Sequence, residues 1–311
     1  KNLGEDYLGV VCKQFPRYSE YYGTIKESGI GLACEEVARI ILSENRPFSM
    51  ETAACDEEYE PSSEYDSSFA LQIFAAREAV FKILAKESLS IHEKLIVILD
   101  MGSKIQQCIN TDEYDNIKSV VNDYLKEGIA HTLDETRNLS DSGQFEDISL
   151  QQGIRQILYP YEEMEVLNPE WEVILKDIID SLFEQMSDEE YNILNEEFGT
   201  YMVSRAYEYR QLLEYFVFRY FAKSIYDYDF LGKCQMLVTN FFVIRQMDII
   251  RWLDNHREYS FKDRMDVVHI FSRQVEYSED NIENLYEDFI FDDIFKTDSL
   301  IAILWIDSEN I

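Results

Sequence analysis

The chain has 311 residues, of which 46% are hydrophobic and 29% charged, so it is not an intrinsically disordered chain and has room for one large or two modest domains. Its 61 acidic residues outnumber 28 basic ones, giving a formal net charge of −33, which excludes nucleic acid as a partner and favours basic protein segments. Five scattered cysteines exclude a disulfide framework and indicate a reducing, cytoplasmic compartment, and no apolar run is long enough to insert into a membrane.

The front of the chain predicts a small α+β portion. Apolar residues at helical spacing predict a helix over residues 3–14. Tyrosine, threonine and isoleucine around several glycines then predict a hairpin over residues 18–33. Cys34 opens the next helix, whose first-turn acids suit the positive end of the helix dipole. A further short strand is predicted over residues 46–57.

An acidic stretch with a proline and two serines, residues 56–66, is the best candidate for a domain boundary. We therefore expect a cysteine-bearing α+β domain over residues 1–60 and a helical domain over residues 61–311. Residues 135–150 lack any period and predict a loop, which could form a second boundary inside the helical domain.

Helical periodicity dominates after residue 66, and nothing in the chain repeats at a fixed interval. The predicted helices cover residues 69–86, 91–108, 115–126 with Gly128 as the stop, a helix from Pro169, then 188–198, 205–225, 231–253, 261–275, 281–290 and 294–306. The helix over 205–225 is apolar nearly all round, so it is predicted to be the centre of a bundle. The predicted fold is mainly α: a multi-helix, bundle-like domain with a small N-terminal helix–hairpin–helix portion.

Several short motifs favour structural roles. Gly29 and Gly31 imitate a dinucleotide-binding fingerprint, but Cys34 stands where its third glycine would be, and no strand–helix–strand unit surrounds it. The Asp227-Tyr228-Asp229 triplet could bind a metal, yet it directly precedes a helix, where aspartate commonly caps. The four histidines have no spacing typical of metal ligands; they are His92, His131, His256 and His269.

Charged residues inside apolar helices allow two interpretations. Arg245, Asp248 and Arg251 follow one another at intervals of three, and Arg219 lies inside another apolar helix. Buried charges must be paired, so these residues predict an ion-pair network between packed helices. Alternatively, they line a polar pocket in which an arginine holds the carboxylate of a cofactor. The polar insert at residues 272–277 allows the same two interpretations.

Cys12 and Cys34 flank the predicted hairpin. A thiolate at a helix N-terminus is stabilised by the helix dipole, and thiolates select zinc or iron–sulfur clusters. Their spacing is not that of a paired metal motif, so two half-buried structural cysteines remain the alternative. Cys108 and Cys234 lie on apolar helical faces and are predicted to pack in the core.

The same front segment resembles the flagellin lysine-N-methylase family. The sequence LGEDYLGVVCKQFPR, a hairpin and LACEEVARIIL match that family's pattern at Cys12, Pro16, Arg17, Cys34, Glu36, Ala38 and Arg39. Glu35 stands where the family often has proline. Three later blocks, residues 216–227, 244–245 and 272–281, also look like that family, so the resemblance spans nearly the whole chain.

The resemblance implies transfer of methyl groups from S-adenosylmethionine (SAM) to lysine side chains of flagellin. It also implies a 4Fe-4S cluster, with Cys12 and Cys34 as ligands only if further cysteines precede residue 1, where we expect a missing N-terminal portion. Arg17, Arg219 and Arg245 are the candidates for cofactor binding. The catalytic residues are not predicted, although a tyrosine or carboxylate could position the lysine proton.

Two alternatives to the methylase remain. The chain could be a non-catalytic helical module that binds a basic protein partner, or a cluster-carrying redox protein that uses Cys12 and Cys34 without methyl transfer.

Overall fold

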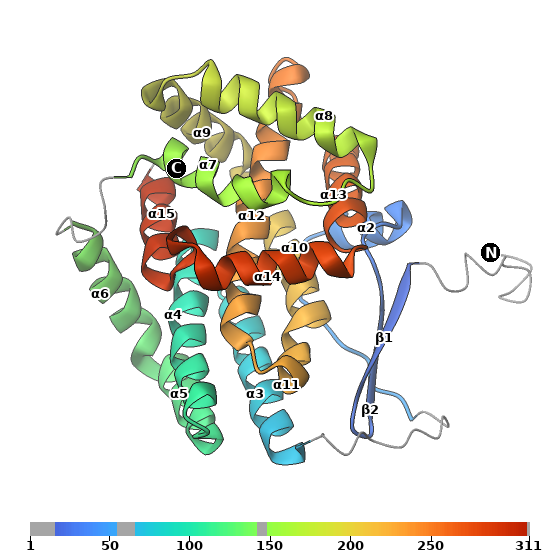
Figure 1. Ribbon diagram of the computed structural model, residues 1–311, viewed down its shortest axis with the longest axis vertical. Coiled ribbons are helices and arrows are strands. Elements are labelled where there is room, and N and C mark those ends of the chain that lie inside the picture. The colour runs from blue at the N-terminus through green and yellow to red at the C-terminus, as the bar shows by residue number, and fades with distance from the viewer. Residues whose placement is uncertain (1–15, 55–65, 142–147, 310–311) are drawn as a thin grey trace, which may run out of the picture.

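The computed structural model describes residues 16–54, 66–141 and 148–309. Helices build nearly all of the described chain, and one two-stranded antiparallel sheet, β1 (Arg17–Tyr22) and β2 (Ile25–Ile30), lies at the N-terminal end (Figure 1). This confirms the predicted mainly α fold and the predicted hairpin. None of the helices in the described ranges is both long enough and apolar enough to span a membrane.

The helices follow the predicted order closely. The α-helices are α2 (Glu35–Leu42), α3 (Ser67–Leu84), α4 (Ile91–Asn110), α5 (Ile117–Asp123), α6 (Ile129–Asp141), α7 (Leu150–Glu162), α8 (Pro169–Ile178), α9 (Asp188–Met202), α10 (Ala206–Tyr220), α11 (Ser224–Asp227), α12 (Phe230–Asp254), α13 (Phe261–Val275), α14 (Glu279–Phe291) and α15 (Thr297–Glu309). Short 3-10 or π segments are η2 (Tyr114–Asn116), η3 (Tyr124–Gly128), η4 (Ile179–Glu184), η5 (Val203–Arg205), η6 (Phe221–Lys223) and η7 (Asp293–Phe295).

Local start signals identify several helix ends correctly. Asp66 caps α3 by accepting hydrogen bonds from two backbone N–H groups, and Ser90 forms a reciprocal capping box with Glu93 at α4. Pro169 occupies the first turn of α8, where its missing N–H costs nothing. These ends depend on neighbouring residues alone, which is why the sequence predicts them.

The central helix is α12, and not the helix predicted over residues 205–225. Of the 25 residues in α12, only Leu231, Arg251, Leu253 and Asp254 are not buried. Helices α4, α7, α8, α10, α13, α14 and α15 of the described chain pack against it, and it runs through the middle of the molecule (Figure 1). The predicted central helix is shorter, because α10 ends at Tyr220 and a 3-10 turn leads into α11.

Residues 135–141 are helical, so the predicted loop over 135–150 is wrong in its first half. Threonines occupy the buried positions of α6, since Thr132 is 2% exposed and Thr136 is 8% exposed. Because threonine is polar, the sequence of this helix shows no periodic pattern of apolar residues. Trp305 donates its indole N–H to the Thr136 hydroxyl at 3.1 Å, which fastens α6 to α15. Gly128 does not stop the preceding helix, because the π turn η3 connects α5 directly to α6.

Residues 45–54 have no regular secondary structure, so the predicted strand over 46–57 is wrong where the structure describes it. The segment is held by side chains. Gln211 donates to the Glu44 carbonyl at 2.8 Å, and Phe48 stacks on Phe81 with ring centroids 4.1 Å apart. The helix predicted over residues 3–14 lies outside the described residues. Most of the proposed boundary does too, and the division near residue 60 stays a prediction.

The hairpin carries an unfavourable charge pair that the helices neutralise. Glu20 and Glu27 stand directly opposite one another across β1 and β2, and like charges in that arrangement repel. Each finds its own cation on the helical body: Lys223 lies 3.0 Å from Glu20, and Arg77 of α3 donates two hydrogen bonds to Glu27. The hairpin is therefore attached to the helices through charge as well as packing.

Candidate active-site groove

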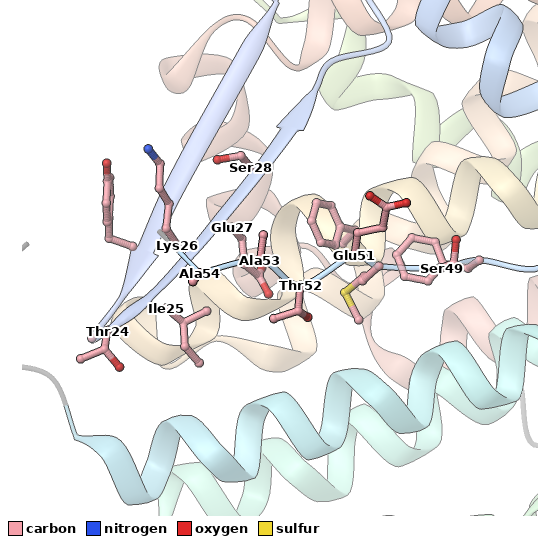
Figure 2. A pocket seen from close by; sticks show the side chains of 15 residues that line it. Thr24, Ile25, Lys26, Glu27, Ser28, Ser49, Glu51, Thr52, Ala53 and Ala54 are labelled. Atoms are coloured by element: carbon pink, nitrogen blue, oxygen red, sulfur yellow. The ribbon is translucent and has the colours of Figure 1, made fainter. Parts of the chain in front are cut away.

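A groove runs between the hairpin, the extended residues 48–54 and α10, and we call it the hairpin groove. Its first part lies beside the hairpin turn and has a volume of about 650 Å³. Figure 2 shows the two extended segments that border it, with helices behind them. The lining combines polar hairpin residues with aromatic rings, among them Tyr21, Thr24, Glu27, Phe48, Glu51 and Phe218.

The second part of the hairpin groove borders α2 and is more apolar. Its volume is about 460 Å³, and its apolar lining includes Tyr18, Val37, Ile40, Ile41, Tyr215 and Phe218. Phe48, Ser49 and Phe218 line both parts, so the two parts adjoin at these residues. The groove therefore changes from polar at the hairpin turn to aromatic and aliphatic beside α2.

Glu214 is the buried carboxylate of the α2 part. Its side chain is only 4% exposed and accepts a 2.6 Å hydrogen bond from Arg210, one helical turn earlier. Burial raises the pKa of the Glu214 carboxyl above its usual value, and the nearby charges of Arg210 and Lys94 oppose that rise. A carboxylate with a raised pKa is a stronger proton acceptor than an exposed one.

Several tyrosines surround an ion pair at the end of the hairpin, and we call this group of residues the tyrosine cluster. Arg219 of α10 lies 3.2 Å from the carboxylate of Glu276, which follows α13. Tyr215 and Tyr220 donate hydrogen bonds to the same Glu276 oxygen at 2.9 and 3.0 Å. Arg219 also lies over the ring of Tyr18, 4.7 Å from its centroid. The pair thus joins β1, α10 and the end of α13.

Gly31 makes this close packing feasible. A Cβ at that position would come within 2.4 Å of the Tyr277 hydroxyl oxygen and 2.9 Å of an Arg219 nitrogen. Both distances are shorter than real Cβ contacts, so any side chain there would force the cluster apart. The sequence GIG therefore serves close approach of the hairpin end to α10, and not the binding of a dinucleotide.

Burial raises the pKa of the Tyr215 and Tyr220 hydroxyls well above the ordinary value of tyrosine, and the charge of Glu276 raises it further. Arg219 opposes this rise in both residues. The hydroxyls consequently stay protonated near neutral pH. Both hydroxyls already donate their proton to Glu276, so they hold that carboxylate in place, and they cannot act as phenolate bases.

The three arginines proposed for cofactor binding do not form one site. Arg17 is exposed at the start of β1, where it pairs with Ile30 of β2. Arg245 of α12 bonds instead to Asn195 of α9 and lies 3.8 Å from Asp307 of α15. Arg219 and Arg245 each have a protein carboxylate as partner, so their role toward a cofactor stays a prediction.

The predicted ion-pair network between helices is confirmed for Arg245 and Asp248. Asp248 of α12 accepts a 2.6 Å hydrogen bond from Arg264 of α13, and Arg264 also donates to Glu208 of α10 at 2.9 Å. All three side chains are at most 1% exposed. Arg251 lies outside this network.

We expect the charge of Asp307 to make the free energy of unfolding depend on pH in the acidic range. Burial opposes its charge, but Arg245 and His92 outweigh burial and lower the pKa of Asp307 to about 2. An unfolded aspartate has a pKa of about 3.9, so Asp307 stabilises the fold above that pH, and the contribution, about 2 kcal/mol, disappears as pH falls from about 4 to about 2. Urea unfolding across this window should show a shallower pH slope in Asp307→Asn than in the wild type. Equal slopes would contradict the assignment.

The cysteines do not assemble a cluster site within the described residues. Cys34 is half-buried at the N-cap of α2, Cys108 is half-buried and Cys234 is buried, and Cys12 lies outside the described residues. No group of three or more candidate metal ligands occurs in the described ranges. Asp229 caps α12 through the Gly232 N–H, which confirms its predicted capping role.

Sequence reasoning missed the residues that make the hairpin groove. Phe48 lies more than 150 residues before Glu214 and Phe218 of α10, and although Phe218 falls in the family-like block 216–227, nothing in that block indicates a groove. The high aromatic content, 21 tyrosines and 19 phenylalanines, was the available signal. It indicates aromatic packing without saying where the rings converge.

Comparison with known proteins gives one family. The model described as "FliB lysine N-methylase C-terminal domain" matches residues 77–303, which covers most of the chain and nearly all of its helices. No curated protein and no solved structure matches the chain. The matched range includes all of α10, with Glu214, Tyr215 and Tyr220.

Proposed function

The chain belongs to the FliB lysine N-methylase family, and from this premise we propose that it transfers methyl groups from SAM to lysine side chains of flagellin. The family match over residues 77–303 is the observation that carries the proposal. The net charge of −33 supports it, because an acidic surface attracts a lysine-bearing protein segment.

We assign the hairpin groove to the substrate lysine. The rings of Phe48 and Phe218, which line both parts, can contact the aliphatic part of a lysine side chain. Removal of water from the α2 part lowers the pKa of a lysine amine, because burial disfavours its charged form. A neutral amine has the free electron pair that methyl transfer needs.

SAM, when bound, supplies an electrophilic methyl group on a positively charged sulfur. The lysine nitrogen forms a bond to this methyl carbon while the carbon–sulfur bond breaks. The electron pair of the broken carbon–sulfur bond stays on sulfur. The lysine ammonium must lose one proton before each methyl transfer, because only the neutral amine can react. The protein's task is therefore to orient the amine, exclude water and receive a proton.

Glu214 is our candidate for the proton acceptor. It is the carboxylate in the α2 part with a raised pKa, and Arg210 holds its orientation. Tyr18 lines the same part and stays protonated because burial raises the pKa of its hydroxyl, which can orient the amine. The Tyr215 hydroxyl is already bonded to Glu276 and Arg219, so Tyr215 contributes its ring. The 4Fe-4S cluster and the cytoplasmic location stay predictions, and no step here uses the cluster.

The test is transfer of labelled methyl groups to flagellin. The full-length protein, purified without oxygen, would be incubated with flagellin and methyl-labelled SAM. We expect label on lysine side chains, and we expect Glu214→Gln to lower kcat by about tenfold to a thousandfold with little change in KM. Glu162→Gln is the matched control: Glu162 also pairs with an arginine, Arg155, but lies on α7.

No label from folded wild-type protein would overturn the methylase proposal for this substrate. Flagellin binding without any label would then favour the non-catalytic binding module. Label that is equally strong in Glu214→Gln would leave the methylase in place and remove Glu214 as the proton acceptor.

A further inference from the structure

The outer edge of β2, which faces away from β1, borders the hairpin groove. Residues 24–28 line the first part of the groove consecutively, and Gly29 and Ile30 line the second part. Successive side chains of a strand point to opposite faces, so a space lined by consecutive residues lies beside the strand and not above one face. The outer edge of β1 is partly covered instead, because Tyr226 donates its hydroxyl to the Tyr21 carbonyl at 2.5 Å.

The register of the hairpin shows which backbone groups of β2 point toward the groove. In an antiparallel pair, residues that bond to the partner strand alternate with residues that bond away from it. The Gly31 N–H donates to the Pro16 carbonyl at 2.7 Å, which fixes this alternation. Ser28 and Ile30 therefore direct their N–H and carbonyl groups away from β1. Within the described ranges these groups bond to no other part of the chain, so a ligand backbone can pair with them.

The opposite wall of the groove leaves room along this edge. Residues 49–54 are exposed, have no regular secondary structure and do not pair with β2, and Figure 2 shows them with residues 24–28 as the two borders of the space. Strand β2 has six residues, which gives an edge of about 20 Å at about 3.4 Å per residue. This edge is long enough to pair with a strand of ordinary length.

The charges of the lining favour a basic occupant. The Glu51 carboxylate lines the first part and has no ion-pair partner among the described residues. The basic side chains nearby already have contacts: Lys26 lies over the Tyr21 ring, 5.3 Å from its centroid, and Arg46 pairs with Glu44 at 2.6 Å. The net charge of −33 acts in the same direction. An extended segment that carries lysine therefore suits this groove in charge as well as in backbone pairing.

We propose that the hairpin groove binds an extended segment of the substrate protein, which adds to β2 as a third strand. The identity of that substrate rests on the proposed function. The segment exchanges backbone hydrogen bonds with Ser28 and Ile30, and its side chains alternate between solvent and the helical body. A lysine directed toward the body meets Phe48 and Phe218 where the two parts adjoin, with Glu214 in the second part. The site thus selects lysines in segments that can extend, and not lysines within helices.

Proline substitutions on the two edges of the hairpin test the pairing without any turnover. Ser28→Pro removes the N–H that faces the groove, whereas Ser19→Pro makes the same change at its register partner on the outer edge of β1. Proline is tolerated on edge strands, so both variants should fold. Fluorescence anisotropy would measure binding of synthetic peptides, each centred on one flagellin lysine. We expect Ser28→Pro to weaken binding by about tenfold or more and Ser19→Pro to leave it unchanged.

Ser28→Ala is the side-chain control. It removes only the hydroxyl, which bonds to the Ser19 hydroxyl at 2.8 Å, so it should bind the peptides as the wild type does. Methylating the backbone nitrogens of a bound peptide one at a time should weaken binding at every second residue, because only alternate N–H groups of an added strand face β2. Loss at every position, or at none, would contradict strand addition.

Equal affinity in Ser28→Pro and Ser19→Pro would overturn the inference even if flagellin lysines were labelled. Failure of the folded wild type to bind any of the peptides would overturn it too. If Ser28→Pro instead abolished self-association of the protein, the occupant of the edge would be a second copy and not the substrate. Peptide binding that depends on Ser28 but is never followed by label would mark failure of the proposed function alone.

Discussion

Replacing Arg264 with leucine is expected to destabilise the protein by about 3–5 kcal/mol, because it leaves the Asp248 carboxylate buried without its cation. Glu208 keeps its ion pair with Arg205. The Arg264 side chain is 0% exposed and bonds to Asp248 and Glu208, which belong to different helices. Burial opposes its charge, yet the nearby carboxylates raise the pKa of Arg264 well above its ordinary value. The guanidinium also lies 4.4 Å from the centroid of the Tyr209 ring, so the variant loses packing as well.

Urea unfolding followed by far-ultraviolet circular dichroism would measure this loss. Lys262→Ala is the matched control, because Lys262 pairs with Asp266 on the same helix but is 83% exposed. Its effect should stay within about 0.5 kcal/mol. If both variants lost a similar small amount, the ion pair between α12, α13 and α10 would not be the stabilising contact that the geometry indicates.

Replacing Arg219 with leucine should release the hairpin before it unfolds the helical body. The variant leaves Glu276, whose side chain is 0% exposed, without a cation, and such a loss costs about 3–5 kcal/mol if the packing stays intact. Detachment of β1 and β2 would let water reach Glu276 at a smaller cost. The global stability should therefore fall by less than in Arg264→Leu, while the hairpin opens locally.

Hydrogen exchange read by mass spectrometry would separate these outcomes. We expect faster exchange in peptides over residues 17–32 and little change in α4 or α12. Arg155→Leu serves as the comparison, since Arg155 and Glu162 form a partly exposed pair inside α7. Uniformly faster exchange throughout the chain would show that the tyrosine cluster supports the whole fold and not the hairpin in particular.

The sequence predicted those parts of the fold that depend on neighbouring residues. Asp66 and Ser90 mark helix starts through hydrogen bonds to backbone N–H groups within three positions, and Pro169 marks one by its place in the first turn. The hairpin followed from its turn glycine and strand-forming residues. In contrast, α6 was missed because buried threonines replaced aliphatic residues, and Trp305, the partner of Thr136, lies 169 positions away.

The candidate sites depend almost wholly on distant pairs. Arg219 meets Glu276, and Leu32 donates its backbone N–H to the Tyr215 hydroxyl at 3.4 Å, across 183 positions. A single sequence does not reveal which charges face one another after folding, so Arg219 and Arg245 were correctly recognised as buried charges without their partners. Arg251 was noted for its spacing, but in the described chain it lies outside the buried ion-pair network of Asp248 and Arg264.

The opposed pair of Glu20 and Glu27 has a consequence for the order of folding. The hairpin is near the beginning of the chain, yet the cations that make its register favourable come from α3 and from the turn after α10. A two-stranded ribbon with facing carboxylates has little stability alone. We therefore expect β1 and β2 to complete their pairing only after Lys223 has joined the assembled helices, so that the hairpin groove is among the last features to form.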